Sequence, residues 1–289
     1  MLVYLILHYK NADVTENCIE ALLRTELGDA EIVVVDNASN NGSYERLTEK
    51  YQECTCIHFM KNESNLGYAA GNNVGFRYAK NELKADWIVL LNNDVIVEQE
   101  RFQQILLSEY EKEPFYIAGP DIITPEGNSQ NPYLMTCPTK KEIIKKLFHD
   151  YVVLFLMKIR VQQLLKKILH YDGSIFQHNE LPSIRNFEGT LHGSCIIFSP
   201  DYINNFNGLY GGTFLYCEEE ILCYILQRLD YSYCYLKTLQ VIHHHSVSMK
   251  REVRDDDKRK MLEISRRIQS YKKFLHIIKE KNDIGRFLV

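Results

Sequence analysis

The sequence predicts an α/β fold in which a mostly parallel central sheet is covered by helices on both faces. From residue 2 to about 119, short β-branched runs alternate with segments of helical spacing, which is the pattern of successive strand–helix units. The strand runs are apolar throughout, as expected for parallel strands buried on both faces. With 289 residues, 45% of them hydrophobic and only seven of them proline, the chain can bury the core of one large domain with additions.

Five strands and four helices account for this first part. The strand runs are VYLILHY, EIVVVD, CIHF, DWIVLL and FYIAG, and helical spacing separates them at residues 13–26, 43–53, 68–81 and 99–112. Ligands of open α/β sheets bind beyond the carboxyl ends of the strands. Polar clusters follow three of these strands, at His8–Asn11, Asp36–Ser39 and Asn92–Asp94, so we expect them to meet at one edge of the sheet.

The rest of the chain departs from this regular alternation. Residues 120–137 carry the turn signals Pro125 and Gly127 and predict turns and a hairpin. Residues 140–170 predict a basic amphipathic helix or helix pair. Residues 187–248 return to an α/β pattern, and residues 251–281 predict a charged helix. The apolar residues that can share one face of the 140–170 helix are Ile144, Phe148, Tyr151, Phe155, Val161, Leu165 and Ile168.

Charge is unevenly distributed along the chain. Residues 140–170 hold eight Lys/Arg against two acids and residues 249–289 hold thirteen against seven, so each segment is +6. Because the whole chain has a net charge of −4, the remainder is −16. Such segregation suggests that two segments face an anionic partner, and docking on an anionic membrane surface is one hypothesis. A helix packed on the body with a solvated basic face, or an oligomer contact, explains the pattern equally well.

The cysteines and the hydropathy bear on location. None of the eight cysteines forms a CxxC pair, which favours reduced thiols in the cytosol over a zinc site. The N-terminal run MLVYLILHYKN lacks a basic leader and a small-residue cleavage site, so it predicts a first strand rather than a signal peptide. No apolar run approaches the length of a membrane span. We therefore expect a cytoplasmic protein, with peripheral contact to the inner face of the cell membrane as an extension of the docking hypothesis.

Three motifs in the first part each have a functional and a purely structural interpretation. VVVDNASNNGS puts Asp36 and Asn37 where a nucleobase or ribose could bind, but it is also a capped helix start. NLGYAAGNNVG repeats glycine every four residues, which suits close helix packing as well as ligand approach. IVLLNNDVIV ends a strand with a carboxylate that could hold a divalent cation together with a diphosphate, or form an ordinary turn.

Two motifs in the second part are candidates for acid–base and metal chemistry. FLYCEEEIL, residues 214–222, contains three consecutive glutamates that could supply a general base. Glutamates in a first helical turn are also favoured simply by the helix dipole. VIHHHSVS, residues 241–248, places His243 and His245 on one face of a strand, where neutral imidazole can bind a divalent metal.

Together and in this order, these motifs resemble glycosyltransferase family 2, in its rhamnosyltransferase-like branch with the GT-A fold of nucleotide-diphospho-sugar transferases. The resemblance rests on VVVDNASNNGS, NLGYAAGNNVG, LLNNDV, HGSCIIFS and FLYCEEEIL, and it covers residues 2 to about 248. It implies a GT-A domain at residues 1–248, with a nucleotide-binding half at 1–119 and an acceptor half at 120–248 that contains the 140–170 insertion. A helical tail at 249–289 follows.

The resemblance also implies roles for individual residues. Glu219 is implied as the catalytic base with Glu218 as its neighbour, and Asp94 and His243 as ligands of Mg²⁺ or Mn²⁺. Asn92 stands where the family's DxD motif has its first aspartate. The implied acceptor-binding residues are His192, Gly193 and Ser194. The implied donor-binding residues are His8, Tyr9, Asn11, Asp36, Asn37, Asn65, Gly67, Gly71, Asn72, Asn92 and Asn93.

The function implied by the resemblance is inverting transfer of a sugar from dTDP-rhamnose or a UDP-sugar to a saccharide or lipid-linked saccharide, in bacterial cell-surface or capsular polysaccharide synthesis. A non-catalytic nucleotide-sugar-binding or scaffold protein of the same fold stays open because of Asn92. A nucleotidyltransferase would need a glycine- and lysine-rich triphosphate loop, which LILHYKNADVT lacks. The acidic body contains no basic–aromatic module, so we expect no nucleic-acid binding; a homo-oligomer stays open.

Overall fold

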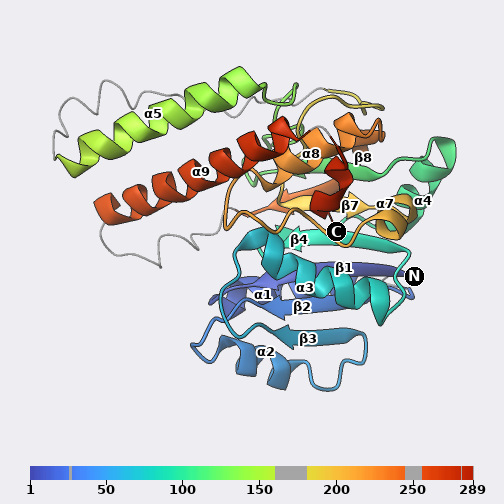
Figure 1. The fold of residues 1–289 in the computed structure, drawn as a ribbon. Coiled ribbons are helices and arrows are strands. Elements are labelled where there is room, and N and C mark those ends of the chain that lie inside the picture. The colour runs from blue at the N-terminus through green and yellow to red at the C-terminus, as the bar shows by residue number, and fades with distance from the viewer. Residues whose placement is uncertain (26–27, 160–180, 245–255, 281, 289) are drawn as a thin grey trace.

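An eight-stranded mixed sheet forms the centre of the protein (Figure 1). The computed structural model describes residues 1–25, 28–159, 181–244, 256–280 and 282–288. The strand order is β3-β2-β1-β4-β7-β6-β8-β5. The strands are β1 Leu2–His8, β2 Glu31–Asp36, β3 Ile57–Lys61, β4 Trp87–Asn92, β5 Val95–Ile96, β6 Ile117–Ile123, β7 Cys195–Phe198 and β8 Tyr233–His243.

Strand direction divides the sheet. β1 pairs in parallel with β2 and β4, and β2 pairs in parallel with β3. β7 is antiparallel to both of its neighbours, β4 and β6, whereas β6 and β8 are parallel. The α/β prediction with a mostly parallel sheet is confirmed. The FYIAG run forms the start of β6, but β7 separates it from β4, and the predicted boundary between residues 119 and 120 lies inside β6.

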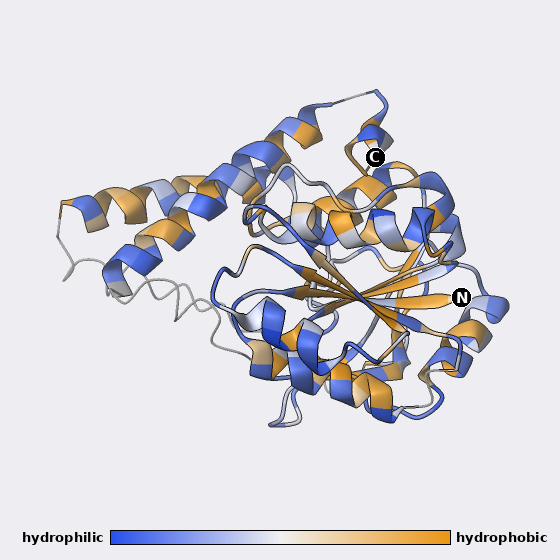
Figure 2. Ribbon diagram, turned by 90° about the horizontal axis from the view of Figure 1, so that it is seen from below, coloured by the Kyte–Doolittle hydropathy of each residue, from blue (hydrophilic) through white to orange (hydrophobic). Residues whose placement is uncertain are grey.

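Helices cover both faces of the sheet, as the edge-on view in Figure 2 shows. Alternate residues of β1 supply two separate cores: Val3 and Leu5 point to one face, and Tyr4 and Ile6 to the other, as the two-residue period of a strand requires. The first face is covered by α3 Tyr68–Asn81, α7 Pro200–Asn205 and α8 Glu218–Arg228. The opposite face is covered by α1 Ala12–Arg24, α2 Ser43–Lys50 and α4 Phe102–Lys112.

Two long helices, α5 Lys140–Lys158 and α9 Asp256–Lys279, lie side by side and project beyond the sheet (Figures 1 and 2). Thr139 and Glu142 form a capping box at the start of α5, which satisfies otherwise unpaired backbone N–H groups. The C-terminal half of α9 returns to the main core through Tyr271, Phe274 and Ile277, and the short helix η2 Ile284–Leu288 ends the described chain.

The structure agrees in part with the elements predicted for residues 120–289. α5 begins at the predicted residue 140, and its predicted continuation over 160–170 lies outside the described residues. The expected hairpin is a short one, because only Ile123 and Ser129 bridge across it. The charged C-terminal helix is present as α9. Among the described helices, none has the length and apolarity needed to cross a bilayer.

Candidate active site

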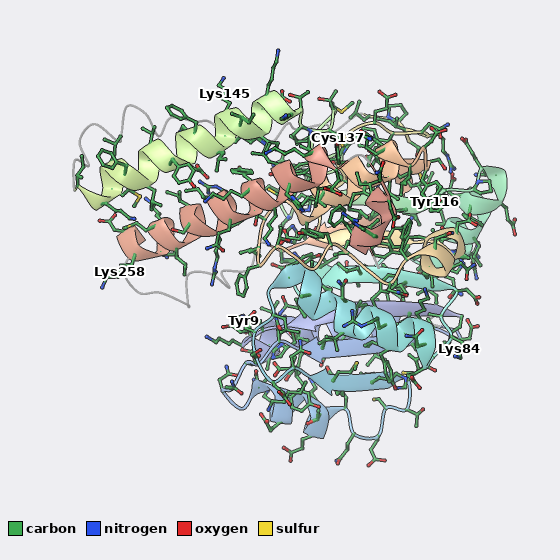
Figure 3. All side chains as sticks on the ribbon, viewed as in Figure 1. Tyr9, Lys84, Tyr116, Cys137, Lys145 and Lys258 are labelled. Atoms are coloured by element: carbon green, nitrogen blue, oxygen red, sulfur yellow. The ribbon has the colours of Figure 1, made fainter. Side chains whose placement is uncertain are left out.

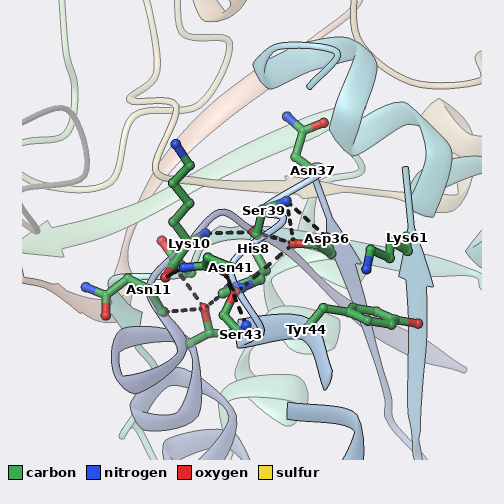
Figure 4. Close-up of polar contacts among 12 residues, drawn as sticks. His8, Lys10, Asn11, Asp36, Asn37, Ser39, Asn41, Ser43, Tyr44 and Lys61 are labelled. Atoms are coloured by element: carbon green, nitrogen blue, oxygen red, sulfur yellow. Dashed lines mark hydrogen bonds and ion pairs between the residues drawn. The ribbon is translucent and has the colours of Figure 1, made fainter. Parts of the chain in front are cut away.

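The carboxyl ends of β1 and β2 carry two side chains that lie entirely beneath the surface, His8 and Asp36 (Figure 4). The ring nitrogens of His8 are 2.7 Å from Thr15 Oγ1 and 2.8 Å from Ser43 Oγ. Burial lowers the pKa of His8 to about 4 against the opposing charge of Asp36, so the ring is neutral at pH 7. With no exposed surface, neither side chain can contact a donor directly in this conformation, and we reassign both from donor contact to positioning.

What these residues position is a pair of loops. Asp36 accepts hydrogen bonds from the backbone N–H and the hydroxyl of Ser39. Ser39 Oγ in turn accepts from the Lys10 N–H over 2.7 Å, and Asn41 Nδ2 donates to the Lys10 carbonyl over 2.9 Å. Lys10 has a left-handed backbone with φ of 62°, which for a residue with a side chain is strained. The β1–α1 and β2–α2 loops are therefore fixed to each other (Figure 4).

The rim of these loops offers an aromatic ring and a cation. Tyr9 and Asn11 are half-buried, and Lys10 Nζ lies 4.8 Å from the centroid of the Tyr9 ring. A ring can stack on a nucleobase, and an ammonium group can attract a diphosphate. Lys10 was not among the predicted site residues, although its place two residues beyond the end of β1 could have suggested it.

Asn37 organises the adjoining segment between β3 and α3. It is buried; its Nδ2 donates to Asn65 Oδ1 and to the Gly67 carbonyl, each over 3.0 Å. Its Oδ1 accepts from Asn62 Nδ2 and from the Leu66 N–H. Because all of these contacts are within the protein, Asn37 shapes the loop, and Asn65 is half-buried, so this polar side chain retains an accessible surface.

The repeated glycines on α3 serve close packing. A Cβ on Gly75 would lie 2.3 Å from Leu5 Cδ1, and one on Gly71 would lie 3.0 Å from Leu7 Cδ1. At Gly67, φ is +82° and a Cβ would meet the Phe214 carbonyl oxygen at 2.2 Å. Asn72 is also internal, since its Nδ2 donates to the Tyr68 carbonyl one turn earlier. The packing interpretation of this motif therefore fits better than direct donor contact by Gly71 or Asn72.

The Asn92–Asp94 turn contacts Ser194 on one side and α1 on the other. Asn92 is half-buried, and its backbone N–H donates to the Ser194 carbonyl. Asn93 Nδ2 donates to Thr15 Oγ1 over 3.0 Å, which connects the turn to α1. The carboxylate of Asp94 is nine-tenths buried, and a pocket of about 350 Å³ opens beside it. The pocket is lined by Val14, Asn17, Arg24, Asp94, Ile96, Glu98 and His244.

His243, at the end of β8, faces Asp94. Its Nε2 is 3.3 Å from Asp94 Oδ1, and its Nδ1 is 2.7 Å from Gln130 Oε1, which fixes the ring orientation. The ring of His192 lies 5.6 Å from that of His243, and His192 Nδ1 is 2.9 Å from Ser194 Oγ. The structure thus brings His192 and Ser194 beside Asp94. His245, the other histidine considered for a metal, lies outside the described residues.

The residues around Asp94 fit a divalent cation that is shared with a phosphate ligand. Within the described part of the chain, no three His, Cys, Asp or Glu side chains group closely enough to hold an ion alone. Mg²⁺ bound with a diphosphate takes only one or two protein ligands, because phosphate oxygens and waters complete its shell. The buried Asp94 carboxylate is such a ligand, and His243 Nε2, 3.3 Å from it, adds an imidazole nitrogen, which suits a transition-metal ion better than Mg²⁺.

The acidic turn lies at the start of α8. Glu218 and Glu220 are buried and Glu219 is half-buried. Burial, followed by the charges of Glu220 and Glu218, raises the pKa of Glu219 to about 8, and burial raises the pKa of Glu218 to about 7. Lys146 Nζ on α5 is 3.6 Å from Glu220 Oε1. The helix N-terminus favours these carboxylates, but burial outweighs it, so both groups titrate near neutral pH.

Tyr68 links the acidic turn to the Asp94 turn. Its hydroxyl donates to the Gly193 carbonyl over 2.6 Å. A Cβ on Gly193 would be 3.5 Å from the Glu219 carboxyl carbon, so the missing side chain leaves room in front of the carboxylate. Burial raises the pKa of Tyr68 well above its usual value, and the charges of both Glu219 and Asp94 add to the effect. The residue after Gly193, Ser194, accepts a hydrogen bond from the Asn92 N–H, so the 193–194 backbone lies between the candidate base and the turn that carries the candidate metal ligand.

Comparison with known proteins identifies the family. The family model for glycosyl transferase family 2 matches residues 4–176, well over half of the chain. The chain belongs to glycosyl transferase family 2. The family 2 assignment agrees with the resemblance that the motifs carry, and it makes the polar edge described above the expected place for a sugar donor.

The family 2 chain is also similar to one curated relative in sequence and to two solved structures in fold. The low-salt glycan biosynthesis hexosyltransferase Agl10 of Haloferax volcanii is 26% identical over 256 residues, which are 86% of this chain and 68% of that protein. GalNAc-T7 with UDP, GalNAc and Mn²⁺ superposes with a TM-score of 0.59 at 12% identity, over 89% of this chain and 49% of that one. Residues 1–349 of S. aureus TarS with UDP give 0.54 at 12%, over 98% and 76%.

These structural matches establish a shared fold, and the GT-A prediction for the family 2 chain is confirmed. The chain spans about half the length of GalNAc-T7, so that protein has parts with no counterpart in this chain. At 12% identity the likeness says nothing about which sugar, acceptor or metal this chain uses.

Proposed function

We propose that this protein transfers a sugar from a nucleotide-diphospho-sugar to a hydroxyl group of a saccharide or lipid-linked saccharide, with inversion at the anomeric carbon. The observation that carries the proposal is that two consecutive residues connect the two acidic segments: Gly193 lies beside the Glu219 carboxylate, and the Ser194 carbonyl accepts a hydrogen bond from the Asn92 N–H of the Asp94 turn. One carboxylate with a raised pKa suits proton removal, and the other suits the neutralisation of a departing diphosphate. The UDP held by TarS and the UDP and Mn²⁺ held by GalNAc-T7 are consistent with this assignment.

Glu219 is the proposed base. Its carboxylate stands before Gly193, where the absent side chain leaves space for an acceptor hydroxyl. A pKa near 8 makes the ionised form a better proton acceptor than an exposed glutamate. Glu218 acts as a positioning neighbour that, once ionised, keeps this pKa high. The oxygen freed of its proton attacks the anomeric carbon as the bond to the diphosphate breaks on the opposite side, so a single displacement inverts the configuration.

Asp94 and His243 are the proposed ligands of Mg²⁺ or Mn²⁺, with Asn92 near the ribose or the metal shell. The cation, when bound, supplies positive charge to the leaving diphosphate. Gln130 holds the His243 ring so that Nε2 faces Asp94. Tyr9, Asn11 and Asn65 have accessible surfaces at the loop rim, and we assign them to the donor nucleotide and ribose. Lys10 is assigned to the diphosphate.

The acceptor side is assigned to His192, Gly193 and Ser194. His192 lies between the rings of Tyr133 and His243, with centroids 5.6 Å away in each case, which places it beside the candidate metal ligand His243. The donor is dTDP-rhamnose or a UDP-sugar, and the product belongs to cell-surface or capsular polysaccharide. The division into a donor half and an acceptor half, the cytoplasmic location and a homo-oligomer stay predictions.

A non-catalytic sugar-nucleotide-binding protein is the second candidate. Asn92 in place of an aspartate leaves one carboxylate in the metal turn, and this favours weak metal binding. Donor turnover separates the two functions, because a binding protein would hold the donor without releasing nucleoside diphosphate.

The first experiment is a thermal-shift screen with UDP- and dTDP-sugars, with and without Mn²⁺, followed by turnover with the donor that binds. A ligand that binds only the folded state raises the melting temperature. We expect one donor class to do so in a Mn²⁺-dependent manner, and Asp94→Ala to lose that dependence. NMR of the product linkage then tests inversion: retained anomeric configuration would exclude a single displacement, and a well-folded sample that binds no donor would overturn the proposal.

A further inference from the structure

The outer face of α5 carries a continuous apolar stripe. The stripe consists of Ile144, Phe148, Tyr151, Phe155 and Ile159, spaced three or four residues apart, and each of these side chains is between 42% and 69% exposed. The other exposed large apolar side chains of the described surface form no comparable row, and only Tyr133 and Met135 are near each other in sequence; isolated residues of this kind need no explanation. A row of five along one helix does, because water contact with that much apolar surface is unfavourable.

The stripe is not the face by which α5 is attached to the protein. That attachment uses Val153, which packs with Ile264 and Ile268 of α9, and a bidentate ion pair in which Arg267 donates to both oxygens of buried Asp150 over 2.8 and 2.9 Å. The apolar stripe lies on the opposite side of the helix. α5 therefore has one face that packs against α9 and a second that stays largely exposed, with Lys272 of α9 reaching only its edge at Tyr151.

Cations border the stripe. Lys140, Lys141, Lys145 and Lys158 of α5 are exposed, and Figure 3 shows Lys145 extending away from the helix pair. On the α9 side, Lys272 Nζ lies 5.4 Å from the centroid of the Tyr151 ring. The two acids of α5 are engaged within the protein, Glu142 in the capping box and Asp150 with Arg267. The outer face thus combines apolar side chains with positive charge.

We infer that the α5 stripe docks on the surface of an anionic lipid bilayer, with the five apolar side chains at the level of the acyl chains and the lysines among the headgroups. Apolar residues flanked by lysines are the composition of helices that lie in a membrane interface, and each lysine near an anionic surface adds to binding. A second copy that docked through its own α5 stripe would bring lysines against lysines, so the charges favour lipid over a symmetric stripe-to-stripe dimer.

Docking would also orient the active site. Lys146 stands two residues along α5 from Ile144 and reaches Glu220, the neighbour of the proposed base. The acidic turn of α8 is therefore held directly behind the membrane-facing helix, which would bring a lipid-linked acceptor from the bilayer to Glu219. This last step rests on the proposed function, whereas the docking itself does not.

The test is flotation of the whole protein with vesicles of phosphatidylcholine alone or mixed with phosphatidylglycerol. We expect binding to the anionic vesicles at low salt, little binding to neutral ones, and at least tenfold weaker binding for Phe148→Ser/Phe155→Ser. Lys145→Glu/Lys158→Glu should lose affinity by about fivefold per lysine. One control is Leu23→Ser/Leu107→Ser, at two exposed leucines outside the stripe. The other is Lys84→Glu, at an exposed lysine outside α5. Both control proteins should bind vesicles as the wild type does.

Two results would overturn the inference. The first is an absence of flotation of the wild type with anionic vesicles at low salt. The second is a stable dimer in light scattering that the Phe148/Phe155 variant converts to monomer, with flotation unchanged, which would assign the stripe to a second copy. Soluble-donor binding by the thermal-shift assay should be equal in all variants, so failure of docking and failure of the proposed function are distinguishable.

Discussion

The side-chain amide of Asn93 donates a hydrogen bond to the hydroxyl of Thr15 over 3.0 Å. The same hydroxyl is 2.7 Å from the ring of His8, whose other nitrogen is 2.8 Å from Ser43 Oγ. An unbroken chain of contacts thus joins the β2–α2 loop to the turn that carries Asp94. All four of these side chains are buried, so the chain is shielded from competing water.

Thr15→Val should disconnect the Asp94 turn from the donor loops while conserving shape. We expect a loss of about 1–3 kcal/mol in unfolding free energy, because His8 and Asn93 lose a buried partner, and a rise in the KM for the donor larger than the fall in kcat. Thr15→Ser should restore both. The control is Thr25→Val, which removes a threonine hydroxyl bonded only to the Leu22 carbonyl. An equal rise in its KM for the donor would show that the contacts of Thr15 do not position the donor loops.

Glu219→Gln should abolish transfer and leave donor binding near that of the wild type. The amide keeps the size of the carboxylate but cannot accept the acceptor's proton at a useful rate. Steady-state turnover and the thermal shift with donor measure the two effects separately. Glu220→Gln removes a neighbouring carboxylate that pairs with Lys146 and should retain most of the activity. If Glu219→Gln turned over normally, the base would have to be another group.

The rate should depend on pH through Glu219. Since its pKa is raised to about 8 and the ionised form is the base, kcat/KM should increase up to about pH 8 and then level off. Glu218→Gln removes a like charge that contributes to the shift, so its profile should move to lower pH. A profile that was flat from pH 6 to 9 in both proteins would contradict the assignment.

The same carboxyl groups should make stability depend on pH. Their folded pKa values lie above the ordinary 4.5, so their contribution is full below about pH 4.5 and is lost as the pH rises through 7 to 8. Glu218→Gln should therefore be more stable than the wild type at pH 9, by about 1–3 kcal/mol, and similar to it at pH 5. Thermal melts across this range measure the difference, and the exposed Glu111→Gln should show no such trend.

Gln130 should matter for metal binding without touching the metal. It fixes the ring of His243, and loss of such an orienting partner weakens a site by about 10–100-fold. Gln130→Leu should therefore weaken Mn²⁺ binding in the presence of nucleoside diphosphate, as followed by electron paramagnetic resonance. Gln99→Leu, at a half-buried glutamine whose side chain contacts only backbone, is the control, and equal Mn²⁺ affinity in both variants would remove Gln130 from this role.

The α3 glycines should differ in their tolerance of alanine. Gly75→Ala would press a methyl group against Leu5 and should cost about 1–3 kcal/mol. Gly67→Ala adds a positive φ and a backbone contact at 2.2 Å, so it should be the more severe. Gly127, with φ of +85° and open space around it, isolates strain from crowding and should cost about 1 kcal/mol. Urea unfolding gives the order; a Gly127 variant as unstable as Gly67→Ala would contradict the crowding argument.

The strands were predictable because their signal is local. EIVVVD coincides with β2, and DWIVLL and VYLILHY are each displaced by one residue at both ends from β4 and β1. The position of β7 was not predictable from pattern, since the CIIF run lies more than 100 residues beyond β4 and only long-range pairing inserts it between β4 and β6. Periodicity likewise identified the apolar face of α5. It did not predict that this face stays exposed, because α9 packs against a different face of the helix.

For the candidate site, the sequence indicated which strand ends matter but not which side chains reach the surface. His8 and Asp36 stand at the predicted edge, yet both are fully buried, because the segments that follow β1 and β2 contact them through Thr15, Ser39 and Ser43. Asp94 and His243, nearly 150 residues apart, do come together. Thr15, Tyr68 and Gln130 were missed because their importance lies in contacts across the fold, and a threonine, tyrosine or glutamine in a helix or loop carries no local signal of such a contact.

The insertion of β7 next to β4 has a consequence for how this chain is made. Residues 1–116 contain four parallel strands that can pair as soon as they leave the ribosome, but one edge of β4, the apolar WIVLLN, must wait for residues 195–198. At roughly 5–20 residues per second, that edge is bare for about 5–20 s, and an unpaired apolar strand edge is a template for aggregation. Yield in cells should therefore depend on chaperones and on translation speed over the intervening hundred codons more than on the stability of the finished protein.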